Sequence, residues 1–226
     1  MRKTKIVCTL GPATDTDEAV RDLCLAGMNV ARLNFSHGTH EDHKVRIERV
    51  KKVRESLGLP IALLLDTKGP EYRIKTFKEG KIFLKDGDAF TFTARDVEGD
   101  ETCVSVNYPQ LPRELSVGDR ILLNNGLLSF RVEEIEEGEI RTRVEIGGEL
   151  SNRKSMSVPG KVLQRPYLSE QDKSDIKFGI EMGVDYIACS FVSKKQDLLD
   201  VHAYLDGIGA RDVELIAKIE KKIIKY

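Results

Sequence analysis

The run Ile61-Ala-Leu-Leu-Leu-Asp66-Thr-Lys-Gly-Pro70 decides the fold of this chain of 226 residues. Its first five residues are apolar, as in a strand of a parallel sheet that is buried on both faces. Polar residues follow at once, and Gly69-Pro70 ends the segment. Strands alternate with helices before this run, whereas short strands follow it, so the run marks the boundary between two kinds of structure.

Before the run, two further strands are predicted at Thr4–Leu10 and Asn29–Phe35. Apolar residues at helical spacing predict one helix between these strands and another after the second strand. The second helix opens on a capping box of Thr39 and Asp42 and ends at Gly58. This alternation predicts an α/β fold with a parallel sheet.

From Tyr72 to Leu163 the pattern is all-β, with turn-forming residues between short alternating runs. Asn125-Gly126 between two apolar runs is a strong hairpin signal. We therefore expect residues 72–163 to form an inserted small barrel or sandwich that folds by itself. Strands are predicted at Lys81–Leu84, Ala89–Ala94, Thr102–Val106, Arg120–Leu123, Leu127–Ile135 and Glu139–Ile146.

The strand–helix pattern then resumes, so residues 1–71 and 164–226 are predicted to form one discontinuous domain. A capping box of Ser169 and Asp172 opens a helix, and the spacing of Ser193 and Gln196 predicts another. Strands are predicted at Val184–Phe191 and Glu214–Ile219. The sequence thus has five strands of the βα type, with the all-β insert after the third.

Composition excludes several classes of function. Lys and Arg number 36 against 37 Asp and Glu, which gives a net charge of −1 and no basic footprint for nucleic acid. No apolar run is long enough to span a bilayer. The four cysteines are far apart and form no C-x-x-C pair, so we expect reduced, buried thiols and a cytoplasmic location. Neither a P-loop nor a G-x-G-x-x-G motif is present.

Polar residues cluster where the predicted strands end, which is the edge that carries active sites in α/β folds. A single polar strand end is often only a helix N-cap, but four ends share this property. Cations suited to phosphate or carboxylate are Arg32, Lys68, Arg73 and Lys218. Oxygen donors with one formal charge among them, which suit a monovalent cation, are Asn34, Ser36, Asp66 and Thr67.

Lys218 and Glu220 are two residues apart on an extended strand, so their side chains point to the same face. A lysine beside a magnesium-binding carboxylate suits phosphoryl transfer. His37, His40 and His43 could suggest zinc, but the third is badly phased for one helix face. A helix-start cluster is the better interpretation of these histidines.

Longer motifs resemble the pyruvate kinase family, and they cover residues 1 to about 220. They include Thr4-Lys-Ile-Val-Cys-Thr-Leu-Gly-Pro-Ala13, Met28-Asn-Val-Ala-Arg-Leu-Asn-Phe-Ser-His-Gly38, Leu65-Asp-Thr-Lys-Gly-Pro-Glu71, Ala188-Cys-Ser-Phe-Val192 and Ala217-Lys-Ile-Glu220. The resemblance implies a (β/α)8 TIM barrel with a mobile β-barrel lid inserted after the third strand. This chain would then hold a partial barrel of about five strands together with the lid.

The resemblance also implies transfer of the phosphoryl group of phosphoenolpyruvate to ADP, giving pyruvate and ATP in glycolysis. Mg²⁺ and K⁺ would be the cofactors, and Glu71 resembles the potassium-dependent members. The implied roles are phosphoenolpyruvate contact by Arg32; potassium binding by Asn34, Ser36, Asp66 and the Thr67 carbonyl; nucleotide contact by Arg73 and Lys154 beside Asn34 and His37; transition-state stabilisation by Lys218; and magnesium binding by Glu220.

After Glu220 the sequence departs from the family pattern, which continues with an aspartate that is the second magnesium ligand. Members of the family continue beyond this point with three further barrel units and a C-terminal domain, which these 226 residues do not include. One alternative is therefore a catalytically inactive truncated fragment. Another is a different phosphoenolpyruvate-handling barrel enzyme, although such enzymes lack these motifs. The family forms homotetramers, and the oligomeric state of this chain stays open.

Overall fold

A computed structural model describes residues 3–161 and 163–220, and the chain divides into two compact units. The first unit comprises residues 1–70 and 166–226, and the second comprises residues 71–165. Each unit has its own hydrophobic core, and the two cores share no residue.

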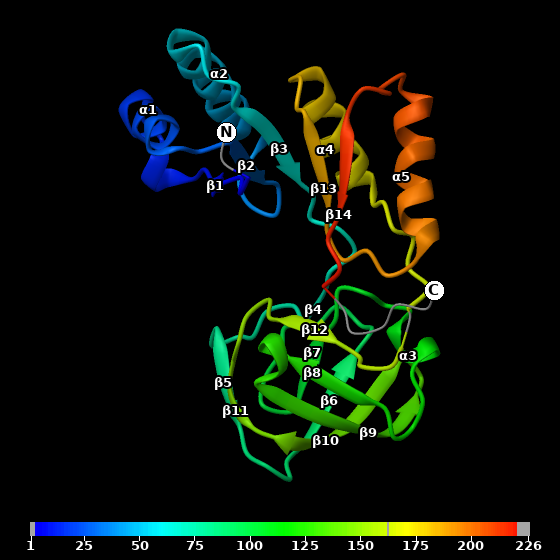
Figure 1. The fold of residues 1–226 in the computed structure, drawn as a ribbon. Helices are drawn as coiled ribbons and strands as arrows, with labels where there is room; N and C mark the ends of the chain where they lie inside the picture. The colour runs from blue at the N-terminus through cyan, green and yellow to red at the C-terminus, as the bar shows by residue number, and fades with distance from the viewer. Residues whose placement is uncertain (1–2, 162, 221–226) are drawn as a thin grey trace. The chain divides into compact units, whose positions relative to one another are not determined.

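The first unit is built on a parallel sheet with the strand order β1-β2-β3-β13-β14 among the described residues (Figure 1). Every neighbouring pair runs parallel, as the apolar strand pattern predicts. The first strand is shorter than the predicted Thr4–Leu10. The bounds are β1 Val7–Thr9, β2 Val30–Asn34, β3 Ala62–Asp66, β13 Tyr186–Cys189 and β14 Glu214–Ala217.

Four helices accompany this sheet: α1 Asp17–Ala26, α2 His40–Leu57, α4 Glu170–Glu181 and α5 Lys195–Gly207, with a 3₁₀ turn at Pro12–Thr14. The capping boxes predicted at the starts of α2 and α4 are confirmed. The box predicted from Ser193 and Gln196 is wrong. The Asp197 carboxylate instead accepts the backbone N–H groups of Ser193 and Lys194, at 2.8 and 3.1 Å, so α5 starts one residue later.

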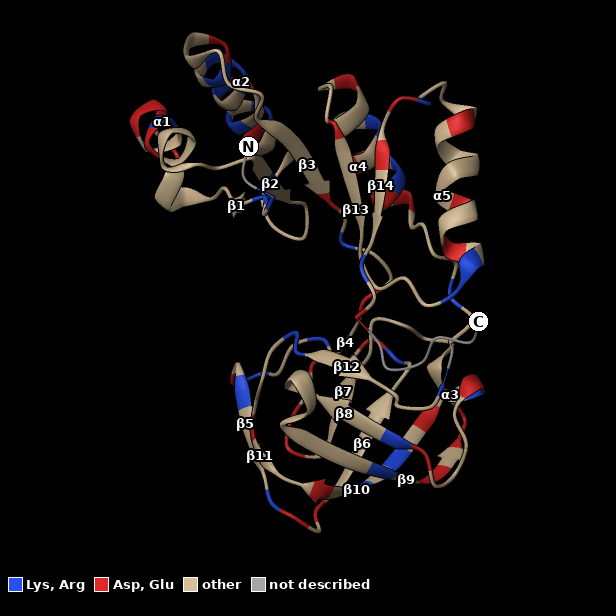
Figure 2. Ribbon diagram, in the orientation of Figure 1, with Lys and Arg blue, Asp and Glu red and all other residues tan. Residues whose placement is uncertain are grey.

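Ion pairs link the start of helix α1 to helix α2. Figure 2 shows acidic residues on α1 and many basic residues along α2. Asp15, just before α1, accepts hydrogen bonds from Arg46 at 2.9 Å and from Arg49 at 3.0 Å. Asp17 pairs with Arg49 and Lys52. Because the Asp15 side chain is 37% exposed, these pairs are screened by water and contribute modestly to stability.

The second unit is almost entirely β, with a seven-stranded sheet in the order β4-β12-β8-β9-β10-β6-β7. An antiparallel bridge pairs Ile74, just after β4, with Val106, just after β7, and so links the two end strands of this sheet. Strands β5 and β11 form a separate antiparallel pair. The bounds are β4 Tyr72–Arg73, β5 Lys81–Leu84, β6 Ala89–Thr93, β7 Cys103–Ser105, β8 Arg120–Leu123, β9 Leu128–Glu136, β10 Glu139–Ile146, β11 Gly148–Ser151 and β12 Ser155–Ser157.

The predicted hairpin around Asn125-Gly126 is confirmed, with Leu123 paired to Leu128 across the turn. Asn124 and Asn125 take positive φ angles of 51° and 58°, which asparagine tolerates better than most residues. Strands β4, β11 and β12 and the short helix α3 (Leu111–Glu114) were not predicted. They have two to four residues each, and the two and three residues of β4 and β12 are too few to give a periodic pattern.

The cysteines are free, and two of them differ from the expectation of burial. Cys24 and Cys189 are buried, but Cys8 and Cys103 are only partly buried. Within the part of the chain that the structure describes, no helix is long and apolar enough to cross a membrane.

Candidate active site

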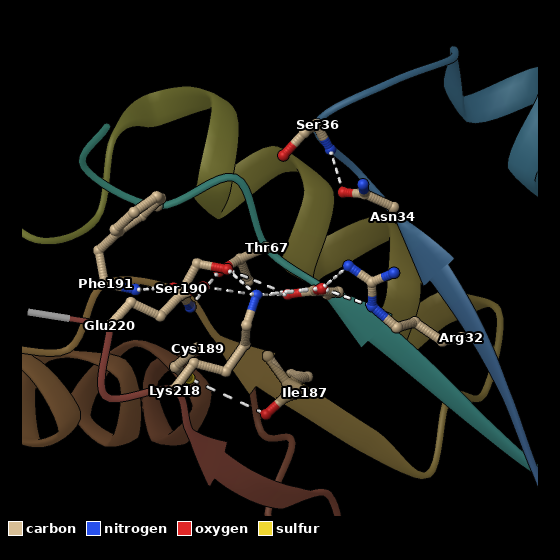
Figure 3. A network of polar contacts seen from close by, with 12 residues as sticks. Arg32, Asn34, Ser36, Thr67, Ile187, Cys189, Ser190, Phe191, Lys218 and Glu220 are labelled. Carbon is tan, nitrogen blue, oxygen red and sulfur yellow. Dashed lines mark hydrogen bonds and ion pairs between the residues drawn. The ribbon is translucent and has the colours of Figure 1, made fainter. Parts of the chain in front are cut away.

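The carboxyl ends of the parallel strands bring the polar motifs of the first unit together, as the sequence predicts. In the register of β2 and β3, Asn34 lies opposite Asp66, and the Phe35 amide donates to the Asp66 carbonyl at 3.0 Å. Ser190 directly follows β13, and Lys218 directly follows β14. Figure 3 shows Arg32, Thr67, Ser190 and Lys218 gathered at this edge of the sheet.

Asp66 is the centre of the network. Its side chain is only 1% exposed and faces two cations. Arg32 donates to Asp66 Oδ2 through Nε at 2.6 Å and also through Nη2. Lys218 Nζ lies 2.9 Å from Oδ1 and 3.2 Å from Oδ2. A buried carboxylate needs such partners, because burial of an unpaired charge is very costly.

The two cations remain reachable from solvent. Arg32 and Lys218 are each 29% exposed, while the carboxylate between them is covered. Arg32 is held on its other side by Thr9 Oγ1, at 2.6 Å from Nη1, and Thr9 lies opposite Arg32 in the register of β1 and β2. The arrangement can present two fixed positive groups to one anion, as phosphate recognition requires.

The oxygen donors predicted for a monovalent cation lie at the ends of β2 and β3. Asn34 Oδ1 accepts the backbone N–H of Ser36 at 3.1 Å, which fixes the Asn34 side chain against the backbone of the residue that carries the Ser36 hydroxyl (Figure 3). Thr67 is buried and follows Asp66 directly. The set provides amide, hydroxyl, carboxylate and carbonyl oxygens. Because its one carboxylate already faces two cations, the set fits a monovalent ion such as K⁺ better than a highly charged ion.

Glu220 lies next to this network. Its Oε2 accepts the backbone N–H of Phe191 at 2.9 Å, and its Oε1 is 3.6 Å from Lys218 Nζ. The side chain is 36% exposed and can therefore bind a further cation. Mg²⁺ commonly uses one or two protein carboxylates together with substrate phosphates and water, and Glu220 fits that pattern. No group of three or more His, Cys, Asp or Glu side chains within residues 3–161 and 163–220 is arranged to hold a metal alone.

Sequence reasoning noted Ser190 only as a polar residue at a strand end and gave it no chemical role. Its hydroxyl donates to Asp66 Oδ1 at 3.0 Å and accepts from Lys218 Nζ at 2.9 Å. The phenol of Tyr167, also missed, donates to the Ser190 carbonyl at 2.7 Å. A serine after a strand gives no signal by itself, because its partners come from strands far away in the sequence.

Buried groups behind the site are held in their neutral forms. Burial raises the pKa of the Cys189 thiol to about 12, and the carboxylates of Asp172 and Asp66 add to this effect. Burial likewise raises the pKa of Tyr167 far above that of an ordinary phenol. Cys189 is therefore not a nucleophile at neutral pH, and Tyr167 keeps the proton that it donates to Ser190.

The other predicted site residues have different surroundings. His37 and Lys68 are exposed, and His37 presents its carbonyl to the ring of His43 at 2.9 Å. Arg73 and Lys154 belong to the second unit. There Arg73 donates to Glu71 at 2.7 Å and to the Arg153 carbonyl at 2.6 Å, so it lies beside the segment that carries Lys154.

Comparisons with known proteins agree on one family. The family model of the pyruvate kinase barrel domain matches residues 1–224. The chain is 43% identical over 223 residues to a pyruvate kinase of Clostridium perfringens, covering 98% of this chain and 47% of the relative. It is 45% identical to a pyruvate kinase of Geobacillus stearothermophilus and 44% identical to one of Staphylococcus haemolyticus, each with 98% of this chain and 38% of the relative covered. The chain thus spans less than half the length of these relatives.

Proposed function

The chain belongs to the pyruvate kinase family, and from this we propose that its first unit carries the site that transfers the phosphoryl group of phosphoenolpyruvate to ADP. The observation that supports this most is the arrangement of Arg32 and Lys218 around the buried carboxylate of Asp66. Two fixed cations at one edge of a parallel sheet suit a phosphoryl group, whose transfer depends mainly on positioning and on neutralisation of charge.

Each cation has a separate part in this proposal. Arg32, held by Asp66 and Thr9, binds the phosphoryl group of phosphoenolpyruvate through its outward N–H groups. Lys218 places its ammonium where negative charge grows during transfer and stabilises the transition state. Both groups are held before substrate binds, by contacts that include Asp66, so neither has to be ordered during the reaction.

Two bound cations complete the proposed site. Asn34, Ser36, Asp66 and the Thr67 carbonyl would hold K⁺, and Glu220 would hold Mg²⁺ together with substrate oxygens. These ions supply electrostatic neutralisation of the phosphate charge. The chain's own contribution is to fix the donors at the ends of β2, β3 and β14.

The second unit is proposed to be the lid of this site, with 72–163 as the inserted domain. Arg73 and Lys154 would contact the phosphates of ADP, beside Asn34 and His37. The contacts of Arg73 with Glu71 and Arg153 support a role for it as a pre-ordered cation. A cytoplasmic location suits soluble metabolite substrates. Nucleic-acid partners are not expected from the near-neutral net charge, and membrane partners are not expected because no apolar run is long enough to span a bilayer.

The test is pyruvate release by the purified chain supplied with phosphoenolpyruvate, ADP, Mg²⁺ and K⁺. We expect turnover, and we expect Lys218→Met to reduce it by roughly 10²–10³-fold, the typical cost of removing one charge-stabilising group. Lys177→Met, which changes an exposed lysine on α4, is the matched control. A folded wild-type chain without turnover contradicts the proposal for this chain.

A second candidate is a chain that binds phosphoenolpyruvate and cations without turning the substrate over. It is favoured by the single magnesium carboxylate, since the described residues hold no larger metal-binding group. Calorimetric titration with phosphoenolpyruvate in the presence of K⁺ and Mg²⁺ separates the two candidates. Binding that Arg32→Ala abolishes, in a chain without turnover, identifies the second.

A further inference from the structure

Ser190 lies between the buried carboxylate and the lysine of the proposed site. We propose that Ser190 is a positioning residue, which fixes the Lys218 ammonium in place through its hydroxyl. The inference rests on the proposed role of Lys218 in phosphoryl transfer. It adds a residue that touches neither substrate nor metal in that proposal.

The first argument comes from the donors of the lysine. An ammonium has three N–H donors and no acceptor. Lys218 Nζ has three acceptors within 3.2 Å: Asp66 Oδ1, Asp66 Oδ2 and Ser190 Oγ. Ser190 Oγ is the acceptor among these three that does not belong to Asp66, so it restrains the direction of the ammonium and not only its distance from the carboxylate.

The second argument is that the hydroxyl is itself fixed. Ser190 is buried, and its Oγ donates to Asp66 Oδ1 at 3.0 Å. Its backbone N–H donates to Thr67 Oγ1 at 3.1 Å, and its carbonyl accepts from the Tyr167 phenol at 2.7 Å. All the polar groups of this one residue are therefore engaged, and they connect segments that follow β3, β13 and β14.

Neighbouring backbone geometry adds to this restraint. A Cβ atom placed on Gly69 would lie 2.6 Å from the Ser190 carbonyl oxygen, so Gly69 packs closely on the turn. Phe191 has a φ angle of 60°, in the left-handed region. That turn directs the Phe191 N–H to Glu220 Oε2. Residues 190–191 therefore orient both the lysine and the proposed magnesium ligand.

A lysine side chain has four rotatable methylene bonds and loses much freedom when it is held. Without the serine hydroxyl, the ammonium keeps its attraction to Asp66 but can swing around the carboxylate. A displacement of about 1 Å from the productive position can cost roughly 10²-fold in rate. The expected effect of losing the hydroxyl is therefore on the chemical step and not on substrate binding.

The experiment compares Ser190→Ala with Ser190→Thr, which keeps a hydroxyl, and with Tyr167→Phe, which frees the Ser190 carbonyl. Cys189→Ala is the matched control, because Cys189 is the adjacent buried residue and its thiol contacts the Ile187 carbonyl instead (Figure 3). NMR relaxation of ¹³C-labelled lysine side chains reports the order of the Lys218 Cε group in each variant. Lys177 serves as an internal exposed lysine.

We expect Ser190→Ala to mobilise the Lys218 Cε group to the level of Lys177, and Ser190→Thr and Cys189→Ala to leave it ordered. In a chain that turns over, Ser190→Ala lowers kcat by roughly 10²-fold with KM changed less than about threefold. If Ser190→Ala does not fold, Tyr167→Phe must raise the mobility of Lys218. Unchanged lysine order in every folded variant overturns the proposal. Absence of turnover in the wild type contradicts only the proposed function, since the relaxation measurement does not depend on it.

Discussion

Lys218 Nζ lies 2.9 Å from Asp66 Oδ1, although the two residues are 152 positions apart in the sequence. Asp66 ends β3, and Lys218 follows β14. Between these two strands in the sheet lies β13, so the ion pair spans a neighbour. The same carboxylate holds Arg32 from β2. One buried group therefore fixes the carboxyl ends of three strands relative to one another.

Asp66→Asn tests how much this carboxylate stabilises the fold. The change removes the charged partner that Arg32 and Lys218 share, and leaves Lys218 only the more distant Glu220 carboxylate, 3.6 Å away. Breaking a fully buried pair costs about 3–5 kcal/mol, and because both cations are 29% exposed we expect a loss of roughly 2–4 kcal/mol in the free energy of unfolding. Urea-dependent hydrogen exchange of the β3 amides measures it.

The control for this change is Asp206→Asn, which removes an exposed carboxylate that lies 3.4 Å from Arg211. Such surface pairs contribute at most about 1 kcal/mol. If the two variants lose the same stability, Asp66 is not the centre that the structure indicates.

The sheet and its site edge could be predicted because the signals are local. Leu63, Leu64 and Leu65 are buried in β3, and the polar residues after them mark the strand end. Parallel pairing then places every strand end at one edge without further information. Long motifs at those ends carry the resemblance to the family.

The partners within the site could not be predicted in the same way. Thr9 and Tyr167 act through hydrogen bonds to residues that are 23 positions away in the sequence, and Ser190 acts through Asp66 and Lys218, which are 124 and 28 positions away. No periodicity records such a pairing, and hydroxyl residues after strands are common. The two-residue strand β4 is likewise set by its neighbour β12, because Tyr72 and Arg73 have no pattern of their own.

Gly69→Ala tests the close packing at the end of β3. Gly69 has a φ angle of 66°, and an added Cβ would meet the Ser190 carbonyl oxygen at 2.6 Å. Gly58→Ala is the matched control, since Gly58 has a φ angle of 61° but nothing within 4 Å of its Cβ position. We expect about 1–2 kcal/mol of destabilisation for Gly58→Ala, from backbone strain alone. Gly69→Ala should cost clearly more, and equal losses in urea unfolding would show that the turn relaxes freely.

His43 makes stability depend on pH. Burial lowers its pKa below the ordinary value of 6.5, and the hydrogen bond to the His37 carbonyl offsets this only in part. The unfolded chain therefore binds the proton first as the pH falls. Stability is complete above about pH 6.5 and is lost below it, by up to about 1.4 kcal/mol per pH unit, until the folded state also protonates.

The measurement is the free energy of unfolding across this pH range in the wild type, in His43→Gln and in His202→Gln, where His202 is exposed on α5. We expect the slope below pH 6.5 to be smaller in His43→Gln and unchanged in His202→Gln. A His43→Gln curve parallel to the wild type would assign the slope to other groups.

Asp15, a partly exposed residue just before α1, stabilises the contact between α1 and α2 through its ion pairs with Arg46 and Arg49. Its hydrogen bond with Arg46 is the main cause that lowers the pKa of Asp15, so its contribution is present above the unfolded value of 3.8 and is lost as the pH falls through the folded value. Asp15→Asn should cost about 0.5–1 kcal/mol at neutral pH and less in high salt. Asp22→Asn, on the exposed face of α1, should cost nothing comparable. A salt-independent loss would point to packing instead of charge.

The second unit is expected to fold without the first. Its core lies entirely within the insert and includes Phe90, Phe92 and Phe130, whose ring centroids are 5.1–5.7 Å apart. A core of this kind can support a domain of about 95 residues. A chain of residues 71–165 should therefore melt cooperatively, as followed by circular dichroism.

Phe92→Ala removes a fully buried ring and should lower the free energy of unfolding by about 3–5 kcal/mol, enough to weaken or abolish the transition. Phe83→Ala, at a 66% exposed position, should leave it intact. A gradual, non-cooperative signal from the unmodified insert would mean that its strands depend on the first unit.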